Sequence, residues 1–126
     1  MEMNRHAVHW AEIPAVDFAR ARRFYEAIFA FEMPQARRDG RTMGFLPFDQ
    51  GQGIGAAIVH GAGYAPSSDG PIVYLGAGMD LALVLNRVVA AGGVVLQGKA
   101  AIGPGLGYAA LFRDSEGNRL GLHSPT

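Results

Sequence analysis

Two histidines of this sequence have the residue type and the spacing for acid–base or metal chemistry. His60 and His123 each close a short apolar segment, 57–60 and 120–123, and the two lie 63 residues apart. Histidine titrates near neutral pH and is a common metal ligand, so the pair could act as an acid and a base or hold an ion. Alternatively, both histidines lie at strand ends and bond to backbone or water.

Glu12 is the carboxylate best placed for chemistry. The alternation of residues 6–13 predicts a strand, and its smaller face suits packing under a helix. Trp10 and Glu12 fall on the other face, toward the space around which the sheet curves. A carboxylate in an apolar cavity could act as a general base. It could equally accept hydrogen bonds from the backbone and hold a glycine-rich loop in place.

Large apolar and aromatic side chains supply candidate walls for a binding site. Met43 and Phe45 fall on one face of the predicted strand 42–48, and with Trp10 they could enclose a flat or apolar ligand. Tyr108 follows the glycine-rich loop 102–107 and could also reach such a site. Ordinary core packing is the alternative interpretation, because large apolar residues are usually buried.

Two copies of one module are predicted to position these residues. Segments 17–33 and 80–96 share an aspartate able to cap a helix, an apolar helical stripe and a following apolar strand. The first copy contains the predicted strand 6–13, a helix from Asp17, and strands 31–33, 42–48 and 54–60. After a linker at 61–70, the second contains strand 71–75, helix 80–91, and strands 94–96, 108–113 and 119–123. The sequence therefore predicts an α+β fold, one domain over 1–126 with modules 6–60 and 71–123.

Composition limits the partners of the chain. Of 126 residues 49% are apolar, enough for a core, and Lys plus Arg equals Asp plus Glu at 11 each, which argues against nucleic acid or an anionic membrane as a partner. The absence of cysteine excludes disulfides and thiolate metal sites. No apolar run has the length of a signal peptide or membrane span, so we expect a cytoplasmic protein. Arginines at 20–23 and 37–41 suit solvated faces better than a phosphate site.

The sequence resembles the vicinal oxygen chelate superfamily in three segments, EIPAVDFARARRFYEAIFAFEM, GAGMDLALVLNRVVAAGG and FRDSEGNRLGL. This superfamily includes glyoxalase I, bleomycin-resistance proteins and extradiol dioxygenases. The resemblance covers nearly the whole chain. It implies paired βαβββ modules whose curved mixed sheets enclose a cavity, usually completed in a homodimer. The scaffold carries very different chemistries, so the fold alone does not define the function.

The resemblance also implies where a metal would be bound. Metal-dependent members place His or Glu at four inward positions, which match Trp10, Val73 (or Tyr74), Ile58 (or a residue next to it) and Gly121. Tryptophan, valine, isoleucine and glycine do not coordinate divalent ions. His60 and His123 lie two residues beyond the positions at Ile58 and Gly121, about 6–7 Å along each strand. We therefore expect no metal and no cofactor, with His60, His123 and Glu12 as the remaining route to an ion.

These observations favour a metal-independent protein that binds a small molecule in an apolar cavity, resembling the bleomycin-resistance branch. The alternative is a lyase- or isomerase-like enzyme with Glu12 or a histidine as general base. A homodimer is expected in either case. The predicted ligand-binding residues are Trp10, Glu12, Met43, Phe45, His60, Val73, Tyr108 and His123.

Overall fold

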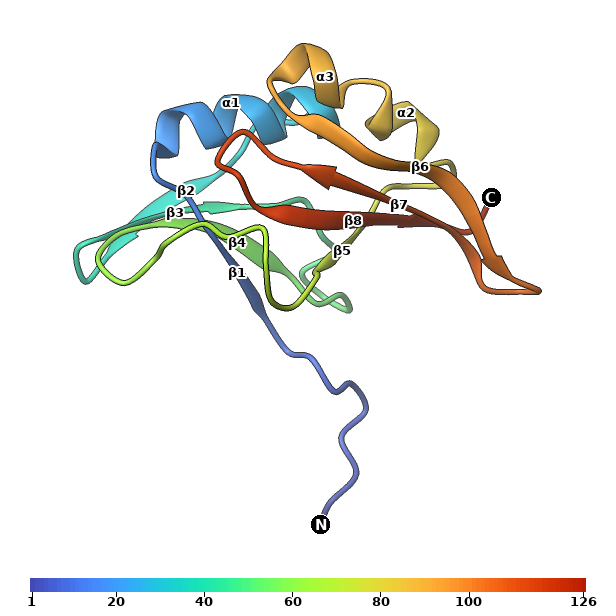
Figure 1. Ribbon diagram of the computed structural model, residues 1–126. Coiled ribbons are helices and arrows are strands. Elements are labelled where there is room, and N and C mark those ends of the chain that lie inside the picture. The colour runs from blue at the N-terminus through green and yellow to red at the C-terminus, as the bar shows by residue number, and fades with distance from the viewer.

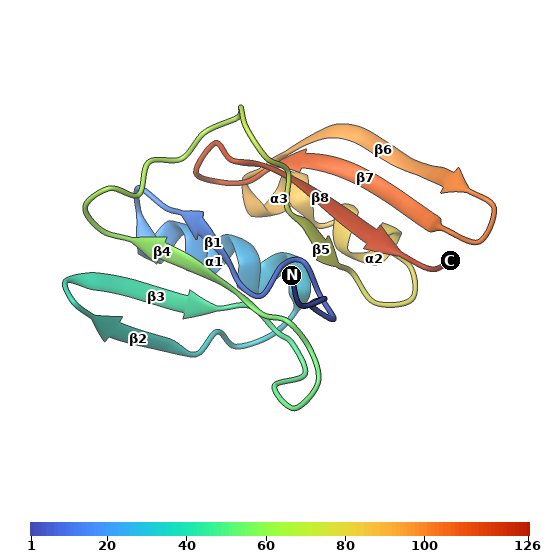
Figure 2. The same ribbon diagram turned by 90° about the horizontal axis from the view of Figure 1, so that it is seen from below.

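Two four-stranded mixed sheets lie side by side, with the helices all on one side of them (Figure 1), and the view from below in Figure 2 shows the open side. The structure is a computed structural model that describes residues 1–126. The first sheet has the order β1-β4-β3-β2 and the second β5-β8-β7-β6, each with one parallel pair, β1 with β4 and β5 with β8. The predicted α+β fold of two tandem modules is confirmed. We call the face of each sheet opposite the helices its inner face.

The first half contains β1 (Ala11–Pro14), α1 (Phe18–Phe29), β2 (Gln35–Arg38), β3 (Arg41–Phe45) and β4 (Ala56–His60). The Asp17 side chain caps α1 by accepting a hydrogen bond from the Arg20 amide at 3.0 Å. The apolar stripe of the helix is buried on the sheet, at Ala21, Phe24, Tyr25 and Ile28. Helix and cap therefore follow directly from the sequence pattern.

The second half contains β5 (Tyr74–Gly76), α2 (Ala82–Leu85), α3 (Val88–Ala91), β6 (Val94–Gly103), β7 (Gly107–Arg113) and β8 (Arg119–Ser124). The prediction of one helix over 80–91 is wrong, because the chain forms two short helices. The Arg87 amide bonds to the Val84 carbonyl, three residues back, which interrupts the α-helical ladder. The Arg87 side chain meanwhile donates to the Ile28 carbonyl at the end of α1, at 3.1 Å.

Several strand boundaries also differ from the prediction. The first strand begins at Ala11 rather than residue 6, so Trp10 precedes it, and residues 31–33 lead into β2 without forming a strand. The strands predicted at 42–48, 54–60 and 71–75 are observed at 41–45, 56–60 and 74–76. Strand β6 continues to Gly103, into the segment predicted as a loop. Apolar content extends beyond each strand, and hydrogen-bond pairing sets the real ends.

The two modules differ in the register of their parallel strand pairs, and this changes the sheet face on which one predicted position lies. Ile58 pairs with Ile13 and is fully buried in the core beneath the helices. Glu12 pairs with Ala57 instead, just as Tyr74 pairs with Gly121 in the second sheet. Laterally paired residues share a face, so the inner position on β4 is Ala57, one residue from Ile58 and within the range left open for this position.

The β7–β8 turn joins the two halves. Asp114, only 4% exposed, accepts hydrogen bonds from the Tyr25 hydroxyl at 2.7 Å and the Asn118 side-chain amide at 3.0 Å. The Asn118 amide also donates to the Pro14 carbonyl at 2.7 Å. Glu116 then accepts from the Val16 and Asp17 amides and pairs with Arg20 at 2.7 Å. A turn of the second half thus binds the start of α1 in the first.

Burial and neighbouring charges shift the pKa values of two residues in these contacts between the halves. Burial raises the pKa of Tyr25 well above its ordinary value, and the charge of Asp114 adds to the shift. Burial also raises the pKa of Glu116, but hydrogen bonds from Arg20, the Asp17 amide and Ser115 outweigh it, so that the pKa lies below its ordinary value. Tyr25 is therefore a neutral donor and Glu116 a charged acceptor at neutral pH.

No helix has the length and apolar character needed to cross a membrane.

We predict that Tyr25→Phe lowers the free energy of unfolding by about 1–3 kcal/mol, because it removes a donor from a buried carboxylate. Urea denaturation measures the change. Tyr108→Phe is the matched control, since the Tyr108 hydroxyl makes no hydrogen bond within the chain. Equal stability of the two variants would contradict a stabilising role for the Tyr25–Asp114 hydrogen bond between the two halves.

Candidate functional site

The inner face of the first sheet has a small apolar floor. Met43, Ala57 and Val59 form a buried cluster there, and Phe45 and Tyr64 pack against it. Met43 is 5% exposed. The predicted residues Met43 and Phe45 thus lie on the expected face, but Met43 is covered by the chain itself.

A polar chain crosses this floor. The Tyr64 hydroxyl donates to Glu12 Oε1 at 2.7 Å and accepts from Arg41 Nη1 at 2.9 Å. The hydrogen bond with Tyr64 raises the pKa of Arg41. Sequence reasoning missed Tyr64, which lies in a linker whose other residues are mostly turn formers. These hydrogen bonds attach the linker to the first sheet through Glu12 and Arg41. Glu12 is exposed and bonded to Tyr64, so it is not a carboxylate in an apolar cavity.

Trp10 belongs to an aromatic group at the edge of the first sheet. Its ring centroid lies 6.2 Å from those of both Phe45 and Phe48. A side chain at Gly55 would overlap these rings, because an added Cβ would meet atoms of Phe48 and Trp10 at 2.7 Å or less. Trp10 is 40% exposed and packs on protein on one side only.

The two histidines occupy separate sheets and bond to backbone. His60 Nδ1 lies 3.0 Å from the Ala15 carbonyl, and His123 Nε2 lies 2.9 Å from the Leu106 carbonyl. These contacts match the interpretation of histidines at strand ends. No three His, Asp or Glu side chains come together in an arrangement that could hold a metal ion.

Tyr108 and His123 border an open hollow of about 600 Å³ along the 101–108 hairpin. Seven of its nine lining residues belong to that one hairpin, so no opposing element closes it. Lys99 Nζ lies 4.6 Å from the centroid of the Tyr108 ring and 2.8 Å from Asp80, on the helix side of the sheet. We interpret this hollow as part of the open protein surface rather than as a binding site, despite its volume.

A smaller and better enclosed cavity of about 240 Å³ lies between the two sheets. We call it the inter-sheet cavity. Ten of its 13 lining residues are hydrophobic and none is charged, which suits an apolar ligand. They are Val8, Ala11, Phe29, Leu46, Pro47, Phe48, Ile54, Gly55, Ala56, Val73, Tyr74, Leu75 and Gly76.

Of the predicted ligand-binding residues, only Val73 lines the inter-sheet cavity. The loop between β3 and β4 provides five of the other walls, and its path has no periodic signal in the sequence. Tyr74 appeared in the sequence as the alternative to Val73.

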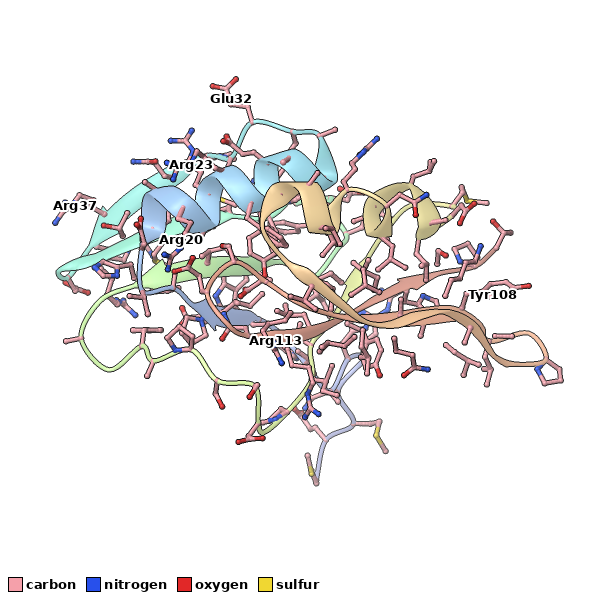
Figure 3. All side chains as sticks on the ribbon, turned by 45° about the horizontal axis from the view of Figure 1, so that its top comes forward. Arg20, Arg23, Glu32, Arg37, Tyr108 and Arg113 are labelled. Carbon is pink, nitrogen blue, oxygen red and sulfur yellow. The ribbon has the colours of Figure 1, made fainter.

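The basic side chains lie elsewhere. Figure 3 shows Arg23 and Arg37 at the end of the molecule away from Tyr108. Both are exposed, and Arg22 pairs with Glu26 on the helix at 3.3 Å. This arrangement is that of a solvated surface.

Comparison with known families defines the class of protein. The family model of the Glyoxalase/Bleomycin resistance protein/Dioxygenase superfamily matches residues 7–122. The chain belongs to this superfamily. No match is found among curated protein sequences.

Solved structures show the same fold at low sequence identity. A glyoxylase/bleomycin resistance protein/dioxygenase domain from Frankia sp. EAN1pec has 19% identity and a TM-score of 0.69, with 98% of this chain and 94% of that chain covered. Glyoxalase I from Zea mays has 15% identity and a TM-score of 0.70, with 92% of this chain and 43% of that chain covered. A FosX mutant from Listeria monocytogenes, complexed with Mn(II) and a dihydroxypropylphosphonic acid, has 15% identity and a TM-score of 0.64, with 98% and 93% covered.

The residues at the metal positions of the family do not fit a divalent ion. Trp10 packs against Phe45 and Phe48 in tilted and edge-on arrangements, and the inner position on β4 is Ala57, whose side chain has no donor atom. Gly121 is covered by the ring of Tyr74, so that a side chain there would overlap the ring. Aromatic and aliphatic groups fill the space where donor atoms would have to converge.

We predict that the purified protein holds less than about 0.1 equivalent of zinc, nickel, manganese or iron after incubation with each ion and desalting, because no set of donors converges. Elemental analysis measures the content. About one tightly held ion per chain, lost in His60→Ala or His123→Ala, would overturn the assignment.

Proposed function

We propose that this chain is a metal-independent small-molecule-binding protein whose ligand occupies the inter-sheet cavity. The observation that carries the proposal is the cavity of about 240 Å³ with 13 lining residues, none of them charged. An apolar cavity of about 150 Å³ already accepts benzene. The space is therefore large enough for a small organic molecule.

The position of the cavity supports the same proposal. Its walls come from both halves of the chain, including β1, β4, β5 and the end of α1. Clefts where two structural units meet are common ligand sites, because several elements can contribute contacts. The N-terminal segment extends away from the body (Figure 1), and only Val8 of its first ten residues lines the cavity.

The electrostatics of the cavity distinguish it from the site of an anion-binding relative. FosX is described in complex with Mn(II) and a phosphonic acid. No arginine, lysine or histidine lines the inter-sheet cavity, and an ion buried there would lose its hydration without gaining a partner. The proposed ligand is therefore uncharged.

We also propose that the chain forms a homodimer. The outer edge strand β6 exposes Val94, Val95, Leu96 and Ile102 to between 37% and 49%, and exposed apolar side chains on an edge strand can be covered by a second chain. Twofold pairing is the commonest way in which soluble proteins cover such surface.

For the cavity, we predict that Gly76→Leu weakens benzene binding at least tenfold. An added Cβ at Gly76, which lines the cavity, meets no atom within 4 Å, so we expect a leucine there to fit and to take up space at the cavity. Gly98→Leu is the matched control, because it adds the same side chain in open space on β6. Benzene-induced stabilisation, followed by thermal unfolding, reports the affinity. Equal stabilisation of both variants by benzene would remove the inter-sheet cavity as the site.

For the assembly, we predict a species of twice the chain mass of 13.4 kDa at micromolar concentration in sedimentation velocity. Ile102→Lys should shift the equilibrium toward the single chain, because it replaces an exposed apolar residue of this edge strand with a charge. A single 13.4 kDa species for the unchanged protein at every concentration would refute the homodimer.

A further inference from the structure

The side chain of Tyr64 occupies the inner face of the first sheet. Its hydroxyl donates to Glu12 Oε1 at 2.7 Å and accepts from Arg41 Nη1 at 2.9 Å. Beneath it lies the buried apolar cluster of Met43, Ala57 and Val59. The apolar floor and both hydrogen-bonding partners belong to strands of the first sheet, whereas Tyr64 belongs to the linker 61–70. The binding surface and the ring that fills it are therefore separate parts of the chain.

The contacts of this surface suit a neutral phenol. A phenol combines an O–H donor for Glu12, an oxygen that accepts from Arg41 and an apolar ring for the floor. A carboxylate would be repelled by Glu12, and an ammonium group could not accept from Arg41. A plain hydrocarbon ring would cover the floor but leave both charged groups without their partner. The hydroxyl and the ring are thus both needed.

The first part of the linker is held to the protein mainly by Tyr64. Of residues 62–66, Tyr64 alone makes hydrogen bonds to the rest of the protein. Gly63, just before it, has a φ of 87°, and both Gly63 and Ala65 are exposed. Segments with few hydrogen bonds and little burial open at a low cost in free energy. The Tyr64 ring can therefore leave the sheet without unfolding either half.

The second part of the linker is fixed to the other half of the chain. The Ser67 amide donates to Asn118 Oδ1 at 3.1 Å, and Arg119 Nη2 donates to the Gly70 carbonyl at 3.3 Å. Opening at Tyr64 thus moves only a few residues. The space that it frees is that of one phenol side chain, which limits the ligand to a single ring.

We propose that the inner face of the first sheet is a second binding site, specific for a small neutral phenol, and that Tyr64 closes it in the unliganded protein. Glu12 and Arg41 are the specificity-determining residues, because they bond to the phenol oxygen. None of these three residues lines the inter-sheet cavity, so the site is independent of the binding function proposed above.

Methyl NMR titrations with p-cresol and toluene test the proposal, with the Met43 and Val59 methyl groups as reporters. p-Cresol is the tyrosine side chain as a free molecule, and toluene lacks its hydroxyl. For Tyr64→Ala, we expect p-cresol to bind about tenfold more tightly than toluene, because two hydrogen bonds to charged groups distinguish them. The unchanged protein should bind p-cresol about tenfold more weakly than Tyr64→Ala, as for a site open about a tenth of the time.

A further substitution assigns the preference to Glu12. In the Tyr64→Ala protein, Glu12→Met removes the acceptor and should abolish most of the preference for p-cresol over toluene. Glu32→Met is the matched control, because Glu32 is exposed and projects from the helix side of the molecule (Figure 3). It should leave the preference unchanged. Equal effects of the two substitutions would overturn the role of Glu12.

Two results would overturn the closing role of Tyr64. One is equal affinity of the unchanged protein and Tyr64→Ala for p-cresol. The other is the absence of Met43 and Val59 shifts in the unchanged protein at about ten times the p-cresol concentration that half-saturates Tyr64→Ala. If Tyr64→Ala does not fold, Tyr64→Phe replaces it. This variant keeps the ring and loses both hydrogen bonds, so it should bind p-cresol more tightly than the unchanged protein, and equal affinity would again refute the role.

The location and the specificity of the site can also fail separately. Equal affinity of Tyr64→Ala for p-cresol and toluene would refute a phenol site. Shifts confined to Leu46, Ile54 and Val73 would place p-cresol in the inter-sheet cavity. That result would overturn the second site and leave the proposed function standing.

Discussion

The buried carboxylate of Asp114 is the contact on which the arrangement of the two halves depends. It accepts the Tyr25 hydroxyl from α1 and the amide groups of Glu116 and Asn118 within its own turn. An unpaired carboxylate at this depth would be costly, so the turn and the helix are held in one relative position. That position fixes the second sheet beside the first and so sets the gap in which the inter-sheet cavity lies.

Aromatic rings lie directly over two glycines at or beside the inter-sheet cavity. Trp10 and Phe48 cover Gly55, and Tyr74 covers Gly121. In both places a glycine allows a ring to lie directly on the backbone of the sheet. These rings make the walls apolar. No set of donor atoms is present to hold an ion that would stabilise a charged ligand, so the walls favour a neutral one. One scaffold can therefore support a different use without a change in topology.

The sequence predicted what local physics controls. The stripe and cap of α1 are encoded by neighbouring residues. The break at Arg87 coincides with a hydrogen bond from its side chain to the Ile28 carbonyl, which is distant in sequence. The cavity depends on the path of the β3–β4 loop and on an offset between strands of the repeat. Neither leaves a periodic pattern, so of the predicted site residues only Val73 lines the cavity.

The most direct test of the binding site is a methyl NMR spectrum of the protein titrated with benzene. If the ligand occupies the inter-sheet cavity, we expect saturable shifts of the Leu46, Ile54 and Val73 methyl groups, which line it, with little change at Met43 and Val59 on the inner face of the first sheet. Saturable shifts centred on Met43 and Val59, with the three cavity residues unchanged, would contradict it and would place the site on the inner face of the first sheet.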